Sequence, residues 1–537
     1  MTRRPAPAFL CVPAPRELTR IEVPARFRVL VHVIAYMSSA TPWGIEAREV
    51  QVEVGADFGL PAMQLIGLPD AAVRESRDRV RSAIRNSGYD LKNRNVVINL
   101  APADLKKEGN QLDLPIALGL LTAHRELTPD SLEGRMACGE LGLDGEVRPI
   151  RGALQVAELA RRLGIRELLL PAANGRQAAA LSGTPVVPIT HLRDAIQHLA
   201  GDVTIGPATP LPRSATEAAV PDFSDVRGQE TAKRALEIAA AGGHNVLFVG
   251  PPGTGKTMLA RRLPGILPPL TEAEAITVTK IHSLARAARM NGLLWTRPFR
   301  SPHAGVSSSG LIGGGSMPRP GEISLAHGGV LFLDELPEFR RDALEALRQP
   351  LEDGAVTVVR AQARLTFPAR FTLVAASNPC RCGHLGDPRV ECVCATRDIE
   401  GYRRKLSGPL LDRIDLHIEM PVPSLDELKG PASETSASIA ERVSAARRKQ
   451  SSRFCAGHPT PLNSAMTRRH LDRHCRPTSA AQSLIDAAFE RLAMSARALT
   501  RALKVARTIA DLDSSPKVDV THVAEAIQYR PLDRTGP

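Results

Sequence analysis

One run of eight residues constrains this chain more than any other part of its sequence. It fits the phosphate-binding pattern G-x-x-x-x-G-K-[ST] at every fixed position. The apolar segment before it, Asn245–Val249, predicts a buried parallel strand, and Met258–Leu263 after it predicts a helix. Glycines let the backbone turn its N–H groups toward phosphate oxygens, and the helix N-terminus adds positive charge. The predicted loop consists of Gly250, Pro251, Pro252, Gly253, Thr254, Gly255, Lys256 and Thr257.

Within this loop, Lys256 is expected to reach the β and γ phosphates of ATP, and Thr257 to offer its hydroxyl to Mg²⁺. A glycine-rich turn without a ligand is the alternative. The order of strand, loop and helix favours the phosphate loop.

A second motif, Val330–Glu335, begins with four apolar residues that predict a fully buried strand. Two acids follow at its carboxyl end, where ligands bind in open α/β sheets. We expect Asp334 to hold the Mg²⁺ shell and Glu335 to act as general base on the attacking water. A further buried strand ends at Asn378, and a parallel strand beside the acidic one would bring this amide near the γ phosphate; a turn-capping Asn is the alternative.

The composition narrows the class of protein. Hydrophobic residues make up 43% of the 537 residues, and a prior of about 150 residues per domain predicts about three or four domains. The formal charge of +12 favours acidic partners, nucleic acid first, with a solvated basic surface as the alternative. Apolar runs stay below the roughly 18 residues that span a bilayer, and the eight cysteines do not suggest a disulfide framework. We therefore expect a cytoplasmic protein without a membrane partner.

The N-terminal part carries a family resemblance. Segments Gly59–Pro61, Gly67–Pro69, Asn99–Asp104 and Gly139–Leu141 resemble the N-terminal domain of the magnesium-chelatase-like AAA+ ATPases. The resemblance implies a fold similar to the proteolytic domain of Lon. The segment comparable to the one that carries the Lon nucleophile, Lys107–Asp113, contains no serine, so we expect no protease activity and a packing or docking role instead.

The same resemblance implies roles for residues of the ATPase core. Val226 and Gly228 would border the adenine, and Asn378 would be the residue called sensor 1. Arg413 resembles the arginine finger that reaches the γ phosphate of a neighbouring subunit, with a salt bridge to Asp412 or Asp415 as the alternative. A finger of this kind works only in an oligomer, so we expect a ring, for which the family resemblance implies six chains. For the arginine called sensor 2 we expect Arg497, with Arg501 as the fallback and a solvated helix arginine as the alternative.

The expected fold class is α/β, with a Lon-like N-terminal domain, an AAA+ phosphate-loop core and a C-terminal helical lid. We predict a disordered extension over residues 1–36, and one hypothesis starts translation at Met37. The predicted boundaries are 37–200 for the N-terminal domain, 201–222 for a linker, 223–423 for the core, 424–437 for a second linker and 438–530 for the lid. Within the lid, Thr521 is the expected N-cap of the last helix.

Two basic stretches of the core are candidates for contact with a nucleic-acid backbone. Residues 297–322 contain glycines and arginines that suit a mobile loop, and residues 353–370 predict a hairpin with Arg360, Arg364 and Arg370. Aromatic residues do not alternate with the basic ones, which argues against base stacking. A solvated surface loop is the alternative for both.

A cysteine cluster follows the Asn378 strand. It is formed by Cys380, Cys382, Cys392 and Cys394, and two close pairs of thiolates can hold Zn²⁺ in a tetrahedral site. The C-x-C spacing differs from the usual C-x-x-C, His384 is a substitute ligand, and four reduced thiols that pack in a loop are the alternative.

Three functions remain open at this point. The first is a ring ATPase that moves on single-stranded or branched DNA, for which the competence-protein branch of the family implies branch migration during recombination. The second is a chelatase-type motor subunit that remodels a partner protein. The third is a regulator or scaffold that only binds nucleotide, against which Glu335 and Arg413 argue.

Overall fold

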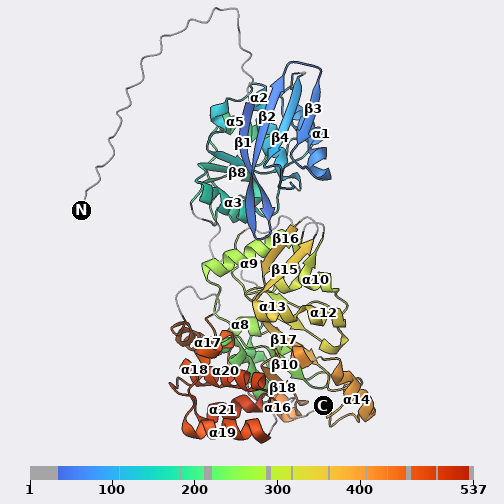
Figure 1. Cartoon of the computed structure of the whole chain (residues 1–537), viewed down its shortest axis with the longest axis vertical. Coiled ribbons are helices and arrows are strands. Elements are labelled where there is room, and N and C mark those ends of the chain that lie inside the picture. The colour runs from blue at the N-terminus through green and yellow to red at the C-terminus, as the bar shows by residue number, and fades with distance from the viewer. Residues whose placement is uncertain are drawn as a thin grey trace, which may run out of the picture.

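The computed structural model describes residues 34–530 except 93, 108, 182, 211–219, 286–291, 316–317, 361–362, 407, 432, 455–460 and 492–493. The predicted N-terminal extension up to residue 33 and residues 211–219 of the first linker therefore lie outside the described residues. Figure 1 shows an elongated molecule with the N-terminal domain at one end, the second sheet in the middle and the C-terminal helices beside it at the other end. The predicted α/β class with a helical C-terminal part is confirmed.

The N-terminal domain is built on a seven-stranded sheet in the order β3-β4-β2-β1-β5-β8-β9. The strands are β1 (Ile34–Trp43), β2 (Glu46–Asp57), β3 (Ala62–Ile66), β4 (Asn95–Ala101), β5 (Arg135–Ala137), β8 (Glu167–Pro171) and β9 (Val186–Ile189). Its helices are α1 (Ala71–Asn86), α2 (Asp113–Ala123), α3 (Ala153–Leu163), α4 (Ala172–Ala178) and α5 (Leu192–Ala200). A turn with Asp144 and Gly145 joins the two strands of a small ribbon, β6 (Glu140–Leu141) and β7 (Val147–Arg148).

The first strand begins earlier than the sequence suggested. β1 starts at Ile34 instead of Met37, because its pairing with β2 runs from Ile34 opposite Gly55 onward. Met37 itself is fully buried in this strand. The ordered domain thus includes three residues that were assigned to the extension.

The middle of the molecule is a five-stranded parallel sheet in the order β11-β14-β17-β10-β18. The strands are β11 (Phe299–Arg300), β14 (Val330–Leu333), β17 (Thr372–Ser377), β10 (Val246–Val249) and β18 (Leu416–Glu419). The helices of this region are α6 (Glu230–Gly242), α7 (Lys256–Ala260), α8 (Leu263–Ile266), α9 (Glu272–Ala285), α10 (Ser308–Ile312), α11 (Glu322–Leu325), α12 (Arg341–Ala346), α13 (Arg348–Asp353), α14 (Thr396–Arg404) and α15 (Gly408–Leu411). The helix expected over Met258–Leu263 is split between α7 and α8, since Pro264 lies at the start of α8.

The stretch 297–322 is not simply a loop, which corrects the expectation for it. Phe299 and Arg300 form β11, the edge strand of the sheet, and Phe299 stacks on Phe332. The short strands β12 (Gly313–Gly314) and β13 (Arg319–Pro320) pair antiparallel and form a further ribbon. The predicted hairpin is confirmed as β15 (Ala355–Arg360) paired with β16 (Ala363–Pro368).

The N-terminal domain rests on the hairpin and on α9 (Figure 1). Trp43 and Ile45, at the turn between β1 and β2, pack against the apolar cluster that contains Leu365 of β16. On the other side, Gln155 of α3 donates a hydrogen bond of 3.0 Å to the carbonyl of Lys280, whose ammonium pairs with Glu158 at 2.6 Å. Apolar and polar contacts therefore both join the two domains.

The C-terminal region is helical, as predicted. It contains α16 (Leu425–Lys429), α17 (Ser436–Ser451), α18 (Arg468–His474), α19 (Ser479–Arg491), α20 (Ala496–Leu512) and α21 (Val520–Gln528). The predicted linker 424–437 holds α16 and the start of α17, because Ser424 forms a capping box with Glu427. Asp519, and not Thr521, caps α21. Within the part of the chain that is described, no helix is both long and apolar enough to cross a bilayer.

Candidate nucleotide-binding site

The phosphate loop lies between β10 and α7, as the sequence predicts. The structure explains why three of its positions are occupied by glycine. A Cβ on Gly250 would lie 2.3 Å from the carbonyl oxygen of Met420, so no side chain fits there. Gly253 and Gly255 adopt φ angles of +79° and +91°, which L residues rarely adopt. Thr254 is buried and donates a hydrogen bond to the carbonyl of Pro251. The loop is thus held in a curled conformation by its own residues.

Lys256 is buried beneath this loop and uses its ammonium group to hold it. Its Nζ donates to the carbonyl oxygens of Gly250 at 2.5 Å and Pro251 at 2.9 Å, and to Oδ1 of Asn378 at 3.2 Å. Burial lowers the pKa of Lys256, and the carboxylates of Asp334 and Glu335 oppose this shift. The cation is therefore already oriented at the mouth of the loop.

The two acids of the second motif follow β14 at the same edge of the sheet. Thr257 donates a 2.8 Å hydrogen bond from Oγ1 to Oδ2 of Asp334, so the two expected Mg²⁺ ligands are neighbours. Hydroxyl and carboxylate oxygens are ligands that Mg²⁺ accepts in nucleotide sites. Glu335 is exposed and has a φ of +52°, which is uncommon for a residue with a side chain. Such a backbone is found at functional sites more often than elsewhere.

Asn378 joins this group because of the order of the strands. β17 lies between β14 and β10, so its carboxyl end emerges between the acids and the phosphate loop. The sequence could predict three strands that end in polar residues; the parallel pairing puts Asn378 in contact with Lys256. Phosphate loop, acids and amide thus meet at one edge.

The residues expected beside the adenine lie on the segment before α6. Val226 is fully buried, and its carbonyl accepts a hydrogen bond from Ser433. Gly228 has a φ of +65°, and a Cβ on it would lie 3.3 Å from Cβ of Glu427. Both residues therefore sit where the core meets the C-terminal region, and their contact with a base stays a prediction.

Arg413 lies at the opposite edge of the sheet, just before β18. Its carbonyl accepts a hydrogen bond from Asn245, the residue that precedes β10. Its guanidinium pairs with Glu352 of α13 and donates to the carbonyl of Pro409 at 2.6 Å. Among the described residues, Arg413 forms its ion pair with Glu352, and not with Asp412 or Asp415 as the alternative expected.

The two sensor 2 candidates differ in their surroundings. Arg497 is exposed in the first turn of α20. Arg501, one turn later, forms a 2.6 Å ion pair with Asp415, which also contacts His244 at 3.2 Å. Leu416, which follows Asp415, pairs with the first residue of β10, so this cluster lies at the amino edge, away from the phosphate loop. In this structure Arg501 therefore contacts Asp415 and not the phosphate loop, and its fallback assignment stays a prediction.

The buried Asp415 cluster escaped the sequence analysis. Burial by itself would raise the pKa of Asp415, but hydrogen bonds and charge from His244 and Arg501 hold it well below the usual range. His244 also bonds Thr508 of α20 at 2.8 Å. The cluster thus fastens the C-terminal helices to the core, and its members are too far apart in sequence to form a motif.

The cysteine cluster is assembled in the connection after Asn378. The four Sγ atoms lie within 4.8 Å of one another, and no other group of three or more such ligands was found among the described residues. His384, the substitute ligand, lies 3.6 Å from Asp387 instead. A hydrogen bond from the backbone N–H of His384 lowers the pKa of Cys382 to about 6.

The arginines of the two basic stretches differ in their exposure and in their partners. Arg297 is buried and donates to the carbonyls of Pro268 and Gly328, and Arg300 forms a bidentate pair with Glu322. These two cations hold the core together, so the expectation of a phosphate contact fails for them. On the hairpin, Arg360 and Arg364 are exposed.

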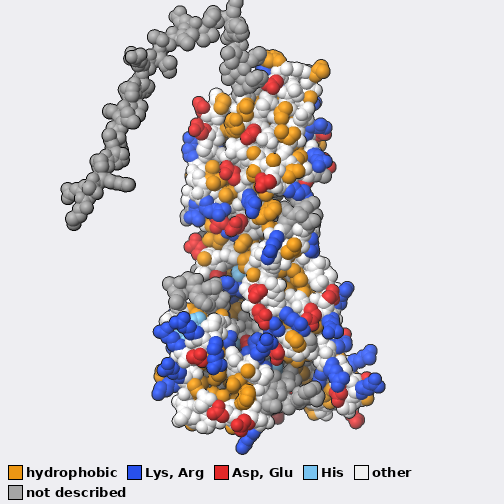
Figure 2. Space-filling view, in the orientation of Figure 1, with side chains coloured by type: hydrophobic (Ala, Val, Ile, Leu, Met, Phe, Trp, Pro, Cys, Tyr) orange, Lys and Arg blue, Asp and Glu red, His pale blue; other side chains and the backbone are white. Residues whose placement is uncertain are grey.

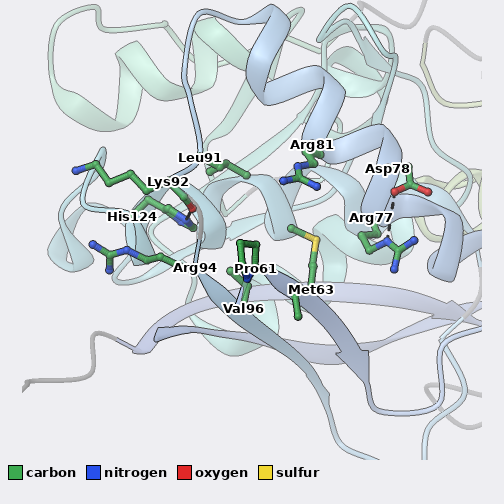
Figure 3. Close-up of a pocket in the computed structure, with 11 residues that line it drawn as sticks. Pro61, Met63, Arg77, Asp78, Arg81, Leu91, Lys92, Arg94, Val96 and His124 are labelled. Carbon is green, nitrogen blue, oxygen red and sulfur yellow. Dashed lines mark hydrogen bonds and ion pairs between the residues drawn. The ribbon is translucent and has the colours of Figure 1, made fainter. Parts of the chain in front are cut away.

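A separate hollow of about 270 Å³ lies on the N-terminal domain. Figure 3 shows Arg77 and Arg81 on α1 at one side, Lys92 and Arg94 on the segment before β4 at another, and Met63 between them. Asp78 pairs with Arg77, so the lining keeps an excess of positive charge. This hollow is not part of the nucleotide site, and cationic side chains line it from two sides (Figure 3).

The fold and the site together define a phosphate-loop protein of the AAA+ class, because the acids and the amide flank the loop on adjacent parallel strands. Family comparisons agree: "Magnesium chelatase, subunit ChlI" matches residues 222–428, "Subunit ChlI of Mg-chelatase" matches 52–174, and "Magnesium chelatase, subunit ChlI C-terminal" matches 433–530. The chain belongs to the magnesium-chelatase-like AAA+ family.

Individual relatives cover nearly the whole chain. The chain is 44% identical to the uncharacterized protein YifB of Escherichia coli over 91% of its length and 96% of that protein. It is 42% identical to the competence protein ComM of Haemophilus influenzae over 93% of its length and 98% of that protein. Similarity to Lon protease 2 of Bacillus subtilis, 31% over 147 residues, supports the expected Lon-like fold of one domain.

Proposed function

We propose that this protein is an ATP-hydrolysing motor that works as a ring and acts on DNA. The observation that carries the ATPase part is the direct contact of Lys256 with Asn378, together with the bond between Thr257 and Asp334. Residues from three separate segments meet there. Such preorganised groups are what phosphoryl transfer requires, since it depends on positioning and electrostatics.

The roles within the site follow from this geometry. Backbone N–H groups of the loop and Lys256 bind the β and γ phosphates, and Thr257 with Asp334 holds Mg²⁺, which when bound neutralises charge on the phosphates. Glu335, exposed after β14, takes the proton of the attacking water. Asn378 orients that water or the γ phosphate. Val226 and Gly228 hold the adenine side, and Arg497 acts as sensor 2.

Arg413 supports the proposal of a ring, which we take to be a hexamer. It lies at the amino edge of the sheet beside Asn245, and the phosphate loop begins at Gly250 beyond the whole of β10. The five residue steps from Asn245 to Gly250 span about 16 Å of extended chain, which is more than an arginine side chain reaches. Arg413 therefore cannot serve the nucleotide of its own chain, and a neighbouring chain is the natural recipient.

DNA is the proposed substrate because the chain has a net positive charge and because one of its relatives is named a competence protein. The chain carries a net charge of +12, and Figure 2 shows Lys and Arg side chains gathered over the core and the C-terminal helices. The exposed hairpin arginines Arg360 and Arg364 and the basic hollow of the N-terminal domain offer contacts to phosphates. The relative ComM is named as a competence protein, which favours a role in branch migration of incoming strands.

Two further assignments complete the proposal. Zn²⁺ on Cys380, Cys382, Cys392 and Cys394 is a third cofactor beside ATP and Mg²⁺. The cytoplasm is the proposed location, where both nucleotide and DNA are present.

The test is an ATPase assay with single-stranded, branched and duplex DNA at low salt, alongside fluorescence anisotropy of the same DNAs. Stimulation by branched or single-stranded DNA is expected. Absence of both binding and stimulation, with ATP present, would contradict the DNA role. Matches to chelatase subunits over three segments keep a partner-remodelling motor as the second candidate, and stimulation by a protein partner alone would favour it. A scaffold that only binds nucleotide would show no turnover at all.

A further inference from the structure

The connection between β17 and α14, residues 378–395, has neither helix nor strand. Loops of more than about 12–15 residues without secondary structure are uncommon in compact domains and usually have a function. This one has little apolar core of its own, since the side chains of Val390 and Val393 are 45% and 86% exposed. Only the start of the connection is more deeply placed, since Pro379 is buried and Cys380 is fully buried. Hydrophobic burial therefore does not explain how the connection is held.

The cysteine sulfurs have the spacing of a metal site. Cys380 Sγ lies 3.4 Å from that of Cys382 and 3.6 Å from that of Cys392, and the last two are also 3.6 Å apart. A tetrahedron with Zn–S bonds of about 2.3 Å has edges of roughly 3.8 Å. A disulfide needs about 2.05 Å, so none of these three pairs is bonded. Four sulfurs that converge in this way suit one Zn²⁺.

The backbone around the cluster supports bound thiolates. The N–H of His384 faces the sulfur of Cys382, and the N–H of Cys382 faces the sulfur of Cys394. Gly383, between these two groups, turns the chain with a φ of +87°. Backbone N–H groups aimed at sulfur stabilise the negative charge of a thiolate and fix its direction toward a metal.

The same turn touches the nucleotide site. A Cβ on Gly383 would lie 3.1 Å from both Cγ and Cδ of Pro252, so the backbone of the cysteine turn packs directly on the phosphate loop. From the other side, Cys380 follows two residues after Asn378, which binds Lys256. The cluster is thereby connected to the phosphate loop twice, once by packing and once through the chain.

We infer that Zn²⁺ on these four cysteines braces the phosphate loop, so that the affinity for ATP depends on the metal. Without the ion the two cysteine pairs are no longer linked to each other, and Pro252 loses a fixed neighbour. The zinc site stands on the cysteine geometry alone, whereas the effect on ATP rests on the proposed nucleotide site.

Metal analysis and nucleotide binding of the full-length protein test this inference. About one zinc per chain is expected, and removal of zinc by a chelator is expected to raise the Kd for a fluorescent ATP analogue at least ~10-fold, with recovery when Zn²⁺ is returned. Cys392→Ser should lose the zinc and the affinity together. Val393→Ala, an exposed position between two ligands, is the matched control and should keep both.

Pro252→Ala separates the metal from the brace. It should keep its zinc, but its Kd for ATP should no longer depend on the metal, because the contact between the Pro252 ring and Gly383 is lost. Purified protein without zinc, or an unchanged Kd after zinc removal, overturns the inference. Wild type that holds zinc but binds no ATP overturns the nucleotide site and the brace together. Since no DNA is present, a failure of the DNA role leaves these results unaffected.

Discussion

The two edges of the five-stranded sheet carry polar groups of opposite character. At the carboxyl edge, Thr257 and Asp334 are partly exposed and Glu335 is exposed. At the amino edge, the side chains of His244 and Asp415 are 0% and 5% exposed and already paired. The first edge leaves donors and acceptors available for a ligand, whereas the second satisfies them internally. Open polar groups therefore mark the reaction site, and closed ones mark the joint between core and C-terminal helices.

Arg413 lies at the amino edge and is paired there, yet we propose that it acts in catalysis. Its substitution is expected to have the largest effect on ATP turnover. Arg413→Ala should lower ATP turnover by ~10³–10⁵-fold, because the finger that stabilises the transition state in the neighbouring chain is lost. The Kd for ATP should stay nearly unchanged. Steady-state ATPase rates and nucleotide binding measure the two quantities.

Arg468→Ala is the matched control for this change, since Arg468 forms an exposed ion pair within α18. Its turnover should equal that of the wild type. Full turnover of Arg413→Ala in a protein that stays monomeric would contradict both the finger and the ring.

The open edge is tested by Glu335→Gln. Loss of the general base should reduce turnover by ~10²–10⁴-fold while ATP still binds, since the amide keeps the shape of the side chain. Glu338→Gln, a nearby exposed carboxylate paired with Lys405, serves as the control and should turn over ATP normally. Equal rates for Glu335→Gln and wild type would mean that another group activates the water.

The difference between the edges also explains what the sequence could predict. Residues 250–257 and Val330–Glu335 are consecutive, so their chemistry is visible in a pattern, and the strand order then brings Asn378 to them. Asp415 meets His244 and Arg501 across 171 and 86 positions, and no local pattern signals such a contact.

Other misses have local causes. β11 has only two residues, which are too few to show the alternation of a strand. Pro298 precedes them at the edge of the sheet, and a proline there makes a strand still harder to predict from the sequence. Arg297 and Arg300 were therefore interpreted as loop cations, although they pair with Glu274 and Glu322. The N-cap of α21 was missed because Asp519 and Thr521 are both good caps, and only the backbone shows which one is used.

A substitution in the buried Asp415 cluster of the amino edge should change the free energy of unfolding, and not the rate of ATP turnover. Asp415→Asn is expected to lower the free energy of unfolding by about 3–5 kcal/mol, because His244 and Arg501 lose a buried charged partner. Urea unfolding measures the change. Asp472→Asn, which breaks an exposed pair, should cost less than about 1 kcal/mol. ATP affinity per folded molecule should be unchanged in both, and a loss confined to Asp415→Asn would show that the amino edge also shapes the nucleotide site.

The smallest expected effect is the pH dependence of the stability that the Asp415 carboxylate contributes. The pKa of Asp415 is held below its usual range, and the groups that face the carboxylate are His244, Arg501, Lys504 and the N–H of Asn245. A carboxyl whose pKa falls on folding stabilises the native state above its unfolded pKa of about 3.9, and this contribution is lost as the pH drops through the folded pKa. The difference in unfolding free energy between wild type and Asp415→Asn should thus be constant from about pH 6 to 5 and shrink below about pH 4, by at most ~1.4 kcal/mol per pH unit. Urea titrations at each pH measure it, and a difference that grows on acidification would show that the Asp415 carboxyl is protonated in the folded protein.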